Sequence, residues 1–177
     1  MKTVTGILLM FAIIALSSCE GPVGPPGPPG EPGEPGVNIL GSVFEIEGDF
    51  TEEFDYTISF EFPADFEIYE SDIVLVYILW SQDNGTDIWR LLPQTIIEGQ
   101  DIVQYNFDYT IADVLIYLTG NVDTFFEEET QNQIFRIAVL PADFVAKKSL
   151  DIYNYNEVMK SLQINQSAIK KVDITKL

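Results

Sequence analysis

Short stretches in which apolar and polar residues alternate recur along the chain from residue 37 onward. Alternation with a period of two places one face of a β-strand against a core and the other in water. These stretches are rich in Val, Ile, Tyr and Phe, the residues that strands favour. The pattern therefore predicts a mainly β fold, an antiparallel β-sandwich. The expected strands cover residues 39–46, 56–62, 73–80, 88–97, 102–107, 114–118 and 134–140.

One segment near the end of the chain has the spacing of a helix instead. Asn154 and Glu157 stand three residues apart, as in a capping box at the start of a helix. Val158 and Leu162 follow on one helical face. We therefore expect one short C-terminal helix over residues 154–162.

The strongest turn signal is the pair Asn84 and Gly85, because both central positions of a type I′ turn need positive φ. A tight hairpin with a two-residue loop here would place Trp80 opposite Trp89, on one side of the sheet. Residues 73–80 are apolar at nearly every position. This run therefore predicts a central strand that is covered on both faces.

The first 18 residues have the layout of an export signal, with Lys2, an apolar run over residues 7–16 and small residues after it. Ten apolar residues are too few to cross about 30 Å of hydrocarbon as a helix. The stretch Leu16-Ser17-Ser18-Cys19 resembles the bacterial lipobox, which implies that a diacylglyceride is attached to Cys19. The alternative is an ordinary signal peptide that contains a cysteine.

Residues 19–36 form a predicted stalk in which every third residue from Gly21 to Gly36 is glycine and most others are proline. This spacing is the collagen signature, because only glycine fits at the axis of three wound polyproline II chains. Two interpretations remain open, a homotrimer with a triple-helical stalk and a single extended chain that acts as a spacer. The head domain is then expected over residues 37–177.

Composition limits what the head can do. The chain has 28 acidic and 9 basic residues, and between residues 3 and 146 the only basic ones are Arg90 and Arg136. This charge disfavours nucleic acid as a partner, because phosphate binding needs clustered Lys and Arg. Histidine is absent and Cys19 is the only cysteine, so histidine-dependent hydrolases and internal disulfides are excluded. We expect no cofactor and no enzymatic activity.

The best candidates for ligand contact are Trp80, Trp89 and Arg90. Paired tryptophan rings could stack against sugar rings or hold a peptide, with the arginine supplying polar contacts. The alternative is that the rings belong to the core, since large aromatic side chains contribute heavily to sandwich cores. Exposure of the two rings separates the interpretations.

The acidic residues offer only weak sites. Asp83, Asn84 and Asp87 could together hold Ca²⁺, but the loop lacks the EF-hand pattern and an ordinary polar hairpin turn is the favoured interpretation. The acidic run that begins at Glu127 is expected as a solvated loop. A glycosidase would need two carboxylates facing one cleft, and among 28 acids no pair stands out.

The run from Cys19 through the collagen triplets to residues 38–45 resembles the collagen-like lipoproteins of Bacteroidetes. Their head domains are similar to this chain at residues 75–77, 92–95, 105–108 and 135–137. The resemblance implies anchoring in the cell envelope, and Glu20 directly after the cysteine resembles a surface-export signal, which implies the outer face of the outer membrane. It supplies no functional residue beyond Cys19. The expected function is display or adhesion by a non-enzymatic head, and the alternative is a carbohydrate- or peptide-binding module.

Overall fold

The computed structural model describes residues 41–142 and 150–174. All the described residues belong to one compact unit, Asn38–Leu177. The predicted signal peptide, the predicted lipidation site Cys19 and the predicted stalk lie outside the described residues. No helix in the described part of the chain is long and apolar enough to cross a membrane.

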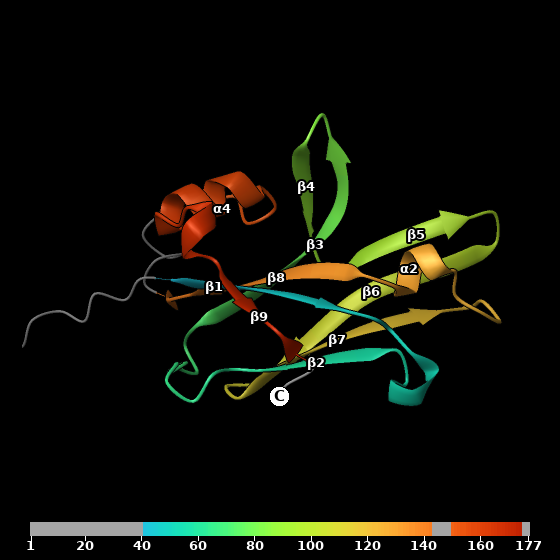
Figure 1. Ribbon diagram of the computed structural model, residues 1–177, viewed down its shortest axis with the longest axis horizontal. Coiled ribbons are helices and arrows are strands. Elements are labelled where there is room, and N and C mark those ends of the chain that lie inside the picture. Colours follow the sequence, from blue (N-terminus) through green and yellow to red (C-terminus); the bar gives the residue numbers. More distant parts are fainter. Residues whose placement is uncertain (1–40, 143–149, 175–177) are drawn as a thin grey trace, which may run out of the picture. The chain divides into compact units, whose positions relative to one another are not determined.

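The head is built from two β-sheets packed face to face, which confirms the predicted sandwich (Figure 1). All neighbouring strands are antiparallel except β1 and β9, which run parallel. The larger sheet has the order β4 (Thr86–Leu91), β3 (Ile73–Asp83), β8 (Gln133–Leu140), β1 (Ser42–Gly48) and β9 (Lys170–Val172). The smaller sheet has the order β2 (Thr57–Glu61), β7 (Asp113–Gly120), β6 (Asp101–Tyr109) and β5 (Gln94–Glu98).

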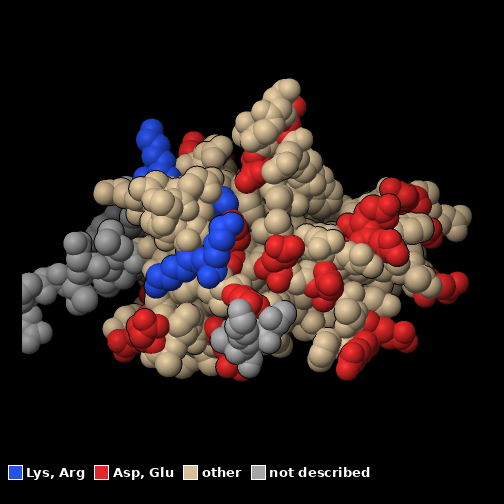
Figure 2. Space-filling model, viewed as in Figure 1, with Lys and Arg blue, Asp and Glu red and all other residues tan. Residues whose placement is uncertain are grey.

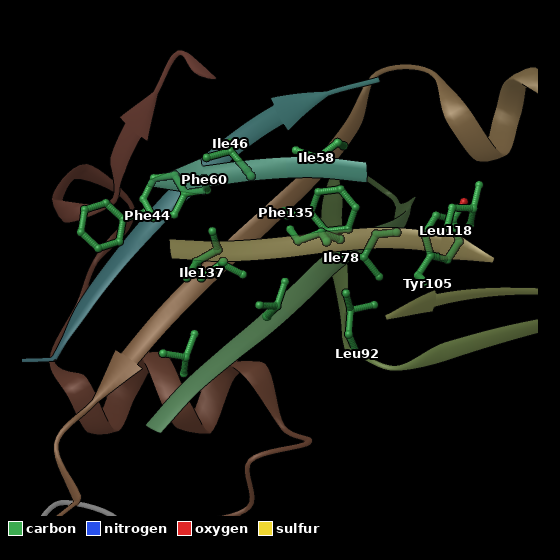
Figure 3. Packing of buried hydrophobic residues seen from close by; sticks show 14 of the residues in the cluster. Phe44, Ile46, Ile58, Phe60, Ile78, Leu92, Tyr105, Leu118, Phe135 and Ile137 are labelled. Carbon is green, nitrogen blue, oxygen red and sulfur yellow. The ribbon is translucent and has the colours of Figure 1, made fainter. Parts of the chain in front are cut away.

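Alternate residues of the strands point between the two sheets and form the main core. Phe44 on β1 and Phe60 on β2 meet there with ring centroids 5.2 Å apart (Figure 3). Phe135 on β8 packs edge-on against Phe50, and all four rings are buried. The period-two pattern of apolar residues in the sequence therefore predicts which side chains form this core.

A second core lies on the other face of the larger sheet, where helix α4 (Tyr155–Leu162) covers it. The helix begins as predicted, because the side chain of Asn154 accepts a hydrogen bond from the backbone N–H of Glu157 at 3.2 Å. It ends at Gln163, which adopts a left-handed conformation. Strand β3 lies between the two cores and is buried on both faces, as its continuous apolar run predicts.

The structure differs from the sequence prediction at several elements. The expected strand over residues 88–97 is two strands, β4 and β5, which belong to different sheets and are separated at Pro93. Proline has no N–H for a ladder, so the chain leaves one sheet there and enters the other. The acidic run expected as a loop forms the short helix α2 (Glu127–Thr130). The pattern also missed β9, η1 (Glu52–Phe54) and η2 (Gln166–Ala168).

Candidate functional site

The hairpin between β3 and β4 projects from the sandwich and carries the predicted ligand residues (Figure 1). Asn84 and Gly85 have φ values of 48° and 79°, so the two-residue loop with positive φ at both positions is confirmed. Asp83 and Thr86 close the loop as opposite partners. The turn chemistry alone was sufficient to predict this part of the hairpin.

The predicted pairing of Trp80 with Trp89 is wrong. The register shifts between Leu79 and Ser81, so Trp89 lies opposite Leu79 and Trp80 is the extra residue of a β-bulge. One extra residue reverses which face the following side chains occupy. Trp80 consequently packs against the main core, whereas Trp89 belongs to the second core beneath α4.

Each tryptophan ring is already covered by other residues of the protein. The guanidinium carbon of Arg90 lies 4.2 Å from the ring centre of Trp80. Trp89 is only 8% exposed and stacks on Tyr155 with ring centroids 5.4 Å apart, while the guanidinium carbon of Arg136 lies 4.0 Å from its ring. The paired platform predicted from Trp80, Trp89 and Arg90 is therefore not formed.

This arrangement predicts unequal access to quenchers. With Trp80→Phe, the remaining emission comes from Trp89 and is expected to be blue-shifted and shielded from acrylamide, because Trp89 is buried. With Trp89→Phe, the half-buried Trp80 should be quenched more strongly. Stern–Volmer constants of the two variants measure the difference, and equal constants would contradict the assignment to opposite faces.

The acidic side chains of the hairpin turn are directed to neighbouring amides. Asp83 Oδ1 accepts from Asn84 Nδ2 at 3.0 Å, and Asp87 Oδ1 accepts from Gln82 Nε2 at 2.7 Å. Across the described ranges, no group of three or more His, Cys, Asp or Glu side chains is placed to hold a metal ion. The geometry here is that of a polar turn.

In the described part of the head, an extensive polar network is centred on Arg136, and no local motif marks it in the sequence. The residue is 3% exposed, and its Nε donates to Glu45 Oε2 at 2.8 Å. It also donates to Gln166 Oε1 at 3.1 Å and to the hydroxyl of Tyr155. Lys171 on β9 contacts the other oxygen of Glu45 at 2.8 Å. Together these bonds join β8, β1, β9 and α4.

The register explains why these groups meet. Tyr77, Arg136, Glu45 and Lys171 are successive partners across β3, β8, β1 and β9, so they form one row on the face beneath α4. Burial by itself raises the pKa of Glu45, but hydrogen bonds and charges from Lys171 and Arg136 outweigh it and lower the pKa. Glu45 is therefore held ionised beside the buried guanidinium. We infer that this row of side chains has a structural role.

A groove of about 1030 Å³ opens on the side of the sandwich where β9 and β2 are the edge strands. Its volume is slightly above the range of about 300–1,000 Å³ that is usual for ligand pockets. The walls come from β1, β2, β9, the start of β8 and the residues that follow β1 and β9. The lining residues are Glu45, Ile46, Glu47, Gly48, Asp49, Thr51, Phe54, Thr57, Ile58, Ser59, Asn132, Ile134, Lys171, Val172, Asp173 and Ile174.

A smaller hollow of about 450 Å³ lies between β4 and the segment that leads into α4. Asp87, Trp89, Asp151 and the exposed ring of Tyr153 contribute to its walls. Among the three predicted ligand residues, Trp89 is the one that lines either cavity. The larger groove contains none of them, and no local motif marks it in the sequence.

Comparison with models of protein families, with curated proteins and with solved structures found no match to this chain. The head is a two-sheet β-sandwich with a groove along one open side. The groove brings together apolar side chains, carboxylates and strand edges, which are the elements of a binding surface.

Proposed function

We propose that this chain is a lipid-anchored protein of the bacterial cell envelope that displays a non-enzymatic β-sandwich head on a collagen-like spacer. The order of the segments from Lys2 through Cys19 to Gly36 supports this proposal, since export, lipid attachment and spacing follow one another without a gap. A triple helix and a single extended chain would both hold the head away from the membrane. The display role therefore does not depend on which of them forms. We place the protein at the outer membrane, facing the exterior.

A binding role for the displayed head is supported by the groove between the edges of β2 and β9. Of the two ligand classes expected from the sequence, peptide is favoured over carbohydrate. A sugar platform needs exposed paired rings, and the β-bulge separates Trp80 from Trp89. Stacking on Arg90 further covers the ring of Trp80.

The anchor is tested by replacing Cys19 with alanine. We expect the wild-type protein to incorporate an alkyne-labelled fatty acid and to fractionate with membranes, because several buried acyl chains hold a protein there almost permanently. The Cys19→Ala protein should lose the label and leave the membrane fraction. Ile97→Ala, at an exposed position of β5 outside the lipobox, is a control that keeps the cysteine. Labelling of Cys19→Ala at the wild-type level would overturn the anchor.

A further inference from the structure

Strand β2 has one edge with no strand partner in the described part of the chain. On its other edge, the C=O of Tyr56 accepts from the N–H of Leu118 at 3.0 Å, which fixes the phase of the ladder with β7. Residues of an antiparallel pair alternate between exchanging both hydrogen bonds and exchanging neither. Thr57, Ser59 and Glu61 therefore direct their backbone N–H and C=O groups away from β7, toward the open edge.

This open edge lies in the groove. Thr57 and Ser59 line it from the smaller sheet. On the opposite wall, β9 pairs with β1 only from Phe44 to Ile46, so β1 continues past the paired part of β9. Unpaired main-chain donors and acceptors at a groove of this size offer a place for one more strand.

The floor of the groove is apolar. On one wall, Ile58 of β2 is buried in the main core. On the other wall, Val172 and Ile174 pack against the same core. Phe54 at one end of the groove is 65% exposed. Side chains from alternate positions of an added strand would rest on this surface, as inward residues do elsewhere in the sandwich.

The charge of the groove indicates what kind of peptide strand could bind there. Its lining contains the carboxylates of Glu47, Asp49 and Asp173, together with Glu45 and Lys171, which already form an ion pair with each other. Acidic side chains are also spread over much of the face in Figure 2, whereas the basic ones lie near α4 and β9. Because opposite charges lower the free energy of association and guide the encounter, the groove favours a cationic partner.

We propose that this groove binds an extended, lysine- or arginine-bearing peptide segment of another protein, which joins the smaller sheet as a strand beside β2. The main chain of the segment pairs with Thr57 and Ser59. Its apolar residues contact Val172 and Ile174, and its cationic residues lie toward Glu47 and Asp49. The inference deepens the proposed binding role and names the ligand class, so it rests on that role.

Binding is tested with three fluorescein-labelled heptapeptides and the intact protein. The first alternates lysine and valine, the second replaces every lysine with glutamate, and the third keeps the first sequence but carries N-methyl groups on alternate residues. Fluorescence anisotropy should show saturable binding of the first peptide that weakens as salt is added. The other two should bind at least about tenfold more weakly, because one repels the groove and the other cannot complete a ladder.

Two variants locate the site. Glu47→Lys should weaken binding of the lysine peptide about tenfold, whereas Glu98→Lys, which makes the same charge change on β5 outside the groove, should not alter it. Ser59→Pro removes an outward N–H without removing a bond to β7, because proline is tolerated on the free side of an edge strand. It should also weaken binding while leaving the thermal unfolding midpoint nearly unchanged.

Amide exchange followed by NMR gives a second measurement. The N–H groups of Thr57 and Ser59 should become protected when the lysine peptide binds.

Equal affinity for the N-methylated peptide, or equal effects of Glu47→Lys and Glu98→Lys, would overturn the proposal by showing adsorption to a charged surface. Absence of peptide binding would overturn it too, and dimerisation abolished by Ser59→Pro would then assign the edge to a second copy. None of these outcomes affects the acyl-labelling test, so failure of the anchor is distinguishable.

Discussion

Glu45→Gln is expected to lower the free energy of unfolding by about 3 kcal/mol at neutral pH. Arg136 is 3% exposed, and the carboxylate of Glu45 is its anionic partner at 2.7 Å. Glutamine keeps the shape but removes the charge, so the guanidinium stays buried without its counter-ion. Urea denaturation of wild type and variant at pH 7 measures the difference.

A double variant shows that the cost comes from the unpaired charge. Glu45→Leu combined with Arg136→Met removes both charges and should be less destabilised than Glu45→Gln alone, since apolar groups often replace a buried ion pair at little cost. If the double variant is the less stable one, the loss in Glu45→Gln arises from packing and the electrostatic explanation is wrong.

The same pair predicts a pH dependence. The folded-state pKa of Glu45 is lowered from its ordinary value of 4.5, so its contribution to stability is fully present above about that pH. That contribution is lost as the pH falls through the lower folded-state pKa. The stability gap between wild type and Glu45→Gln should therefore shrink below about pH 4.5. A gap that stays constant down to pH 2 would contradict the lowered pKa.

Phe44→Ala should destabilise the head by about 3–5 kcal/mol, the cost usual for removing a buried aromatic ring. Phe44 is 0% exposed and lies between the sheets, with the ring centroids of Phe60 and Phe66 at 5.2 and 5.0 Å. Truncation leaves a cavity that neither sheet can close, because β1 is held between β8 and β9. Chemical denaturation gives the free energy directly.

Ile97→Ala is the matched control for Phe44→Ala. Ile97 is also apolar and in a strand, but it is 68% exposed on β5. Its truncation should change stability by no more than about 0.5 kcal/mol. A loss of similar size in both variants would mean that the inter-sheet cluster does not dominate the stability of the head.

Local patterns were sufficient where the physical cause is itself local. Alternation marked strands such as β2 and β7 because these bury every second residue. Asn84 and Gly85 marked the turn because few other residues adopt positive φ, and Asn154 marked the start of α4 because its side chain satisfies a free N–H. The predicted pairing of Trp80 with Trp89 was wrong because it depended on a β-bulge between Leu79 and Ser81. No residue type in this segment is specific for a bulge, so the sequence did not indicate it.

The sequence by itself determined the class of fold, most of its strands, helix α4 and the acidic charge of the chain. Only the tertiary structure decided which acid pairs with Arg136 and where the groove lies. An arginine inside an apolar strand signals a buried charge, but 28 acidic residues compete as partners and Glu45 stands 91 positions away. Strand order sets such contacts, and strand order depends on the summed free energy of many nonlocal pairings. The groove likewise exists because β2 and β9 became the edges on one side of the sandwich.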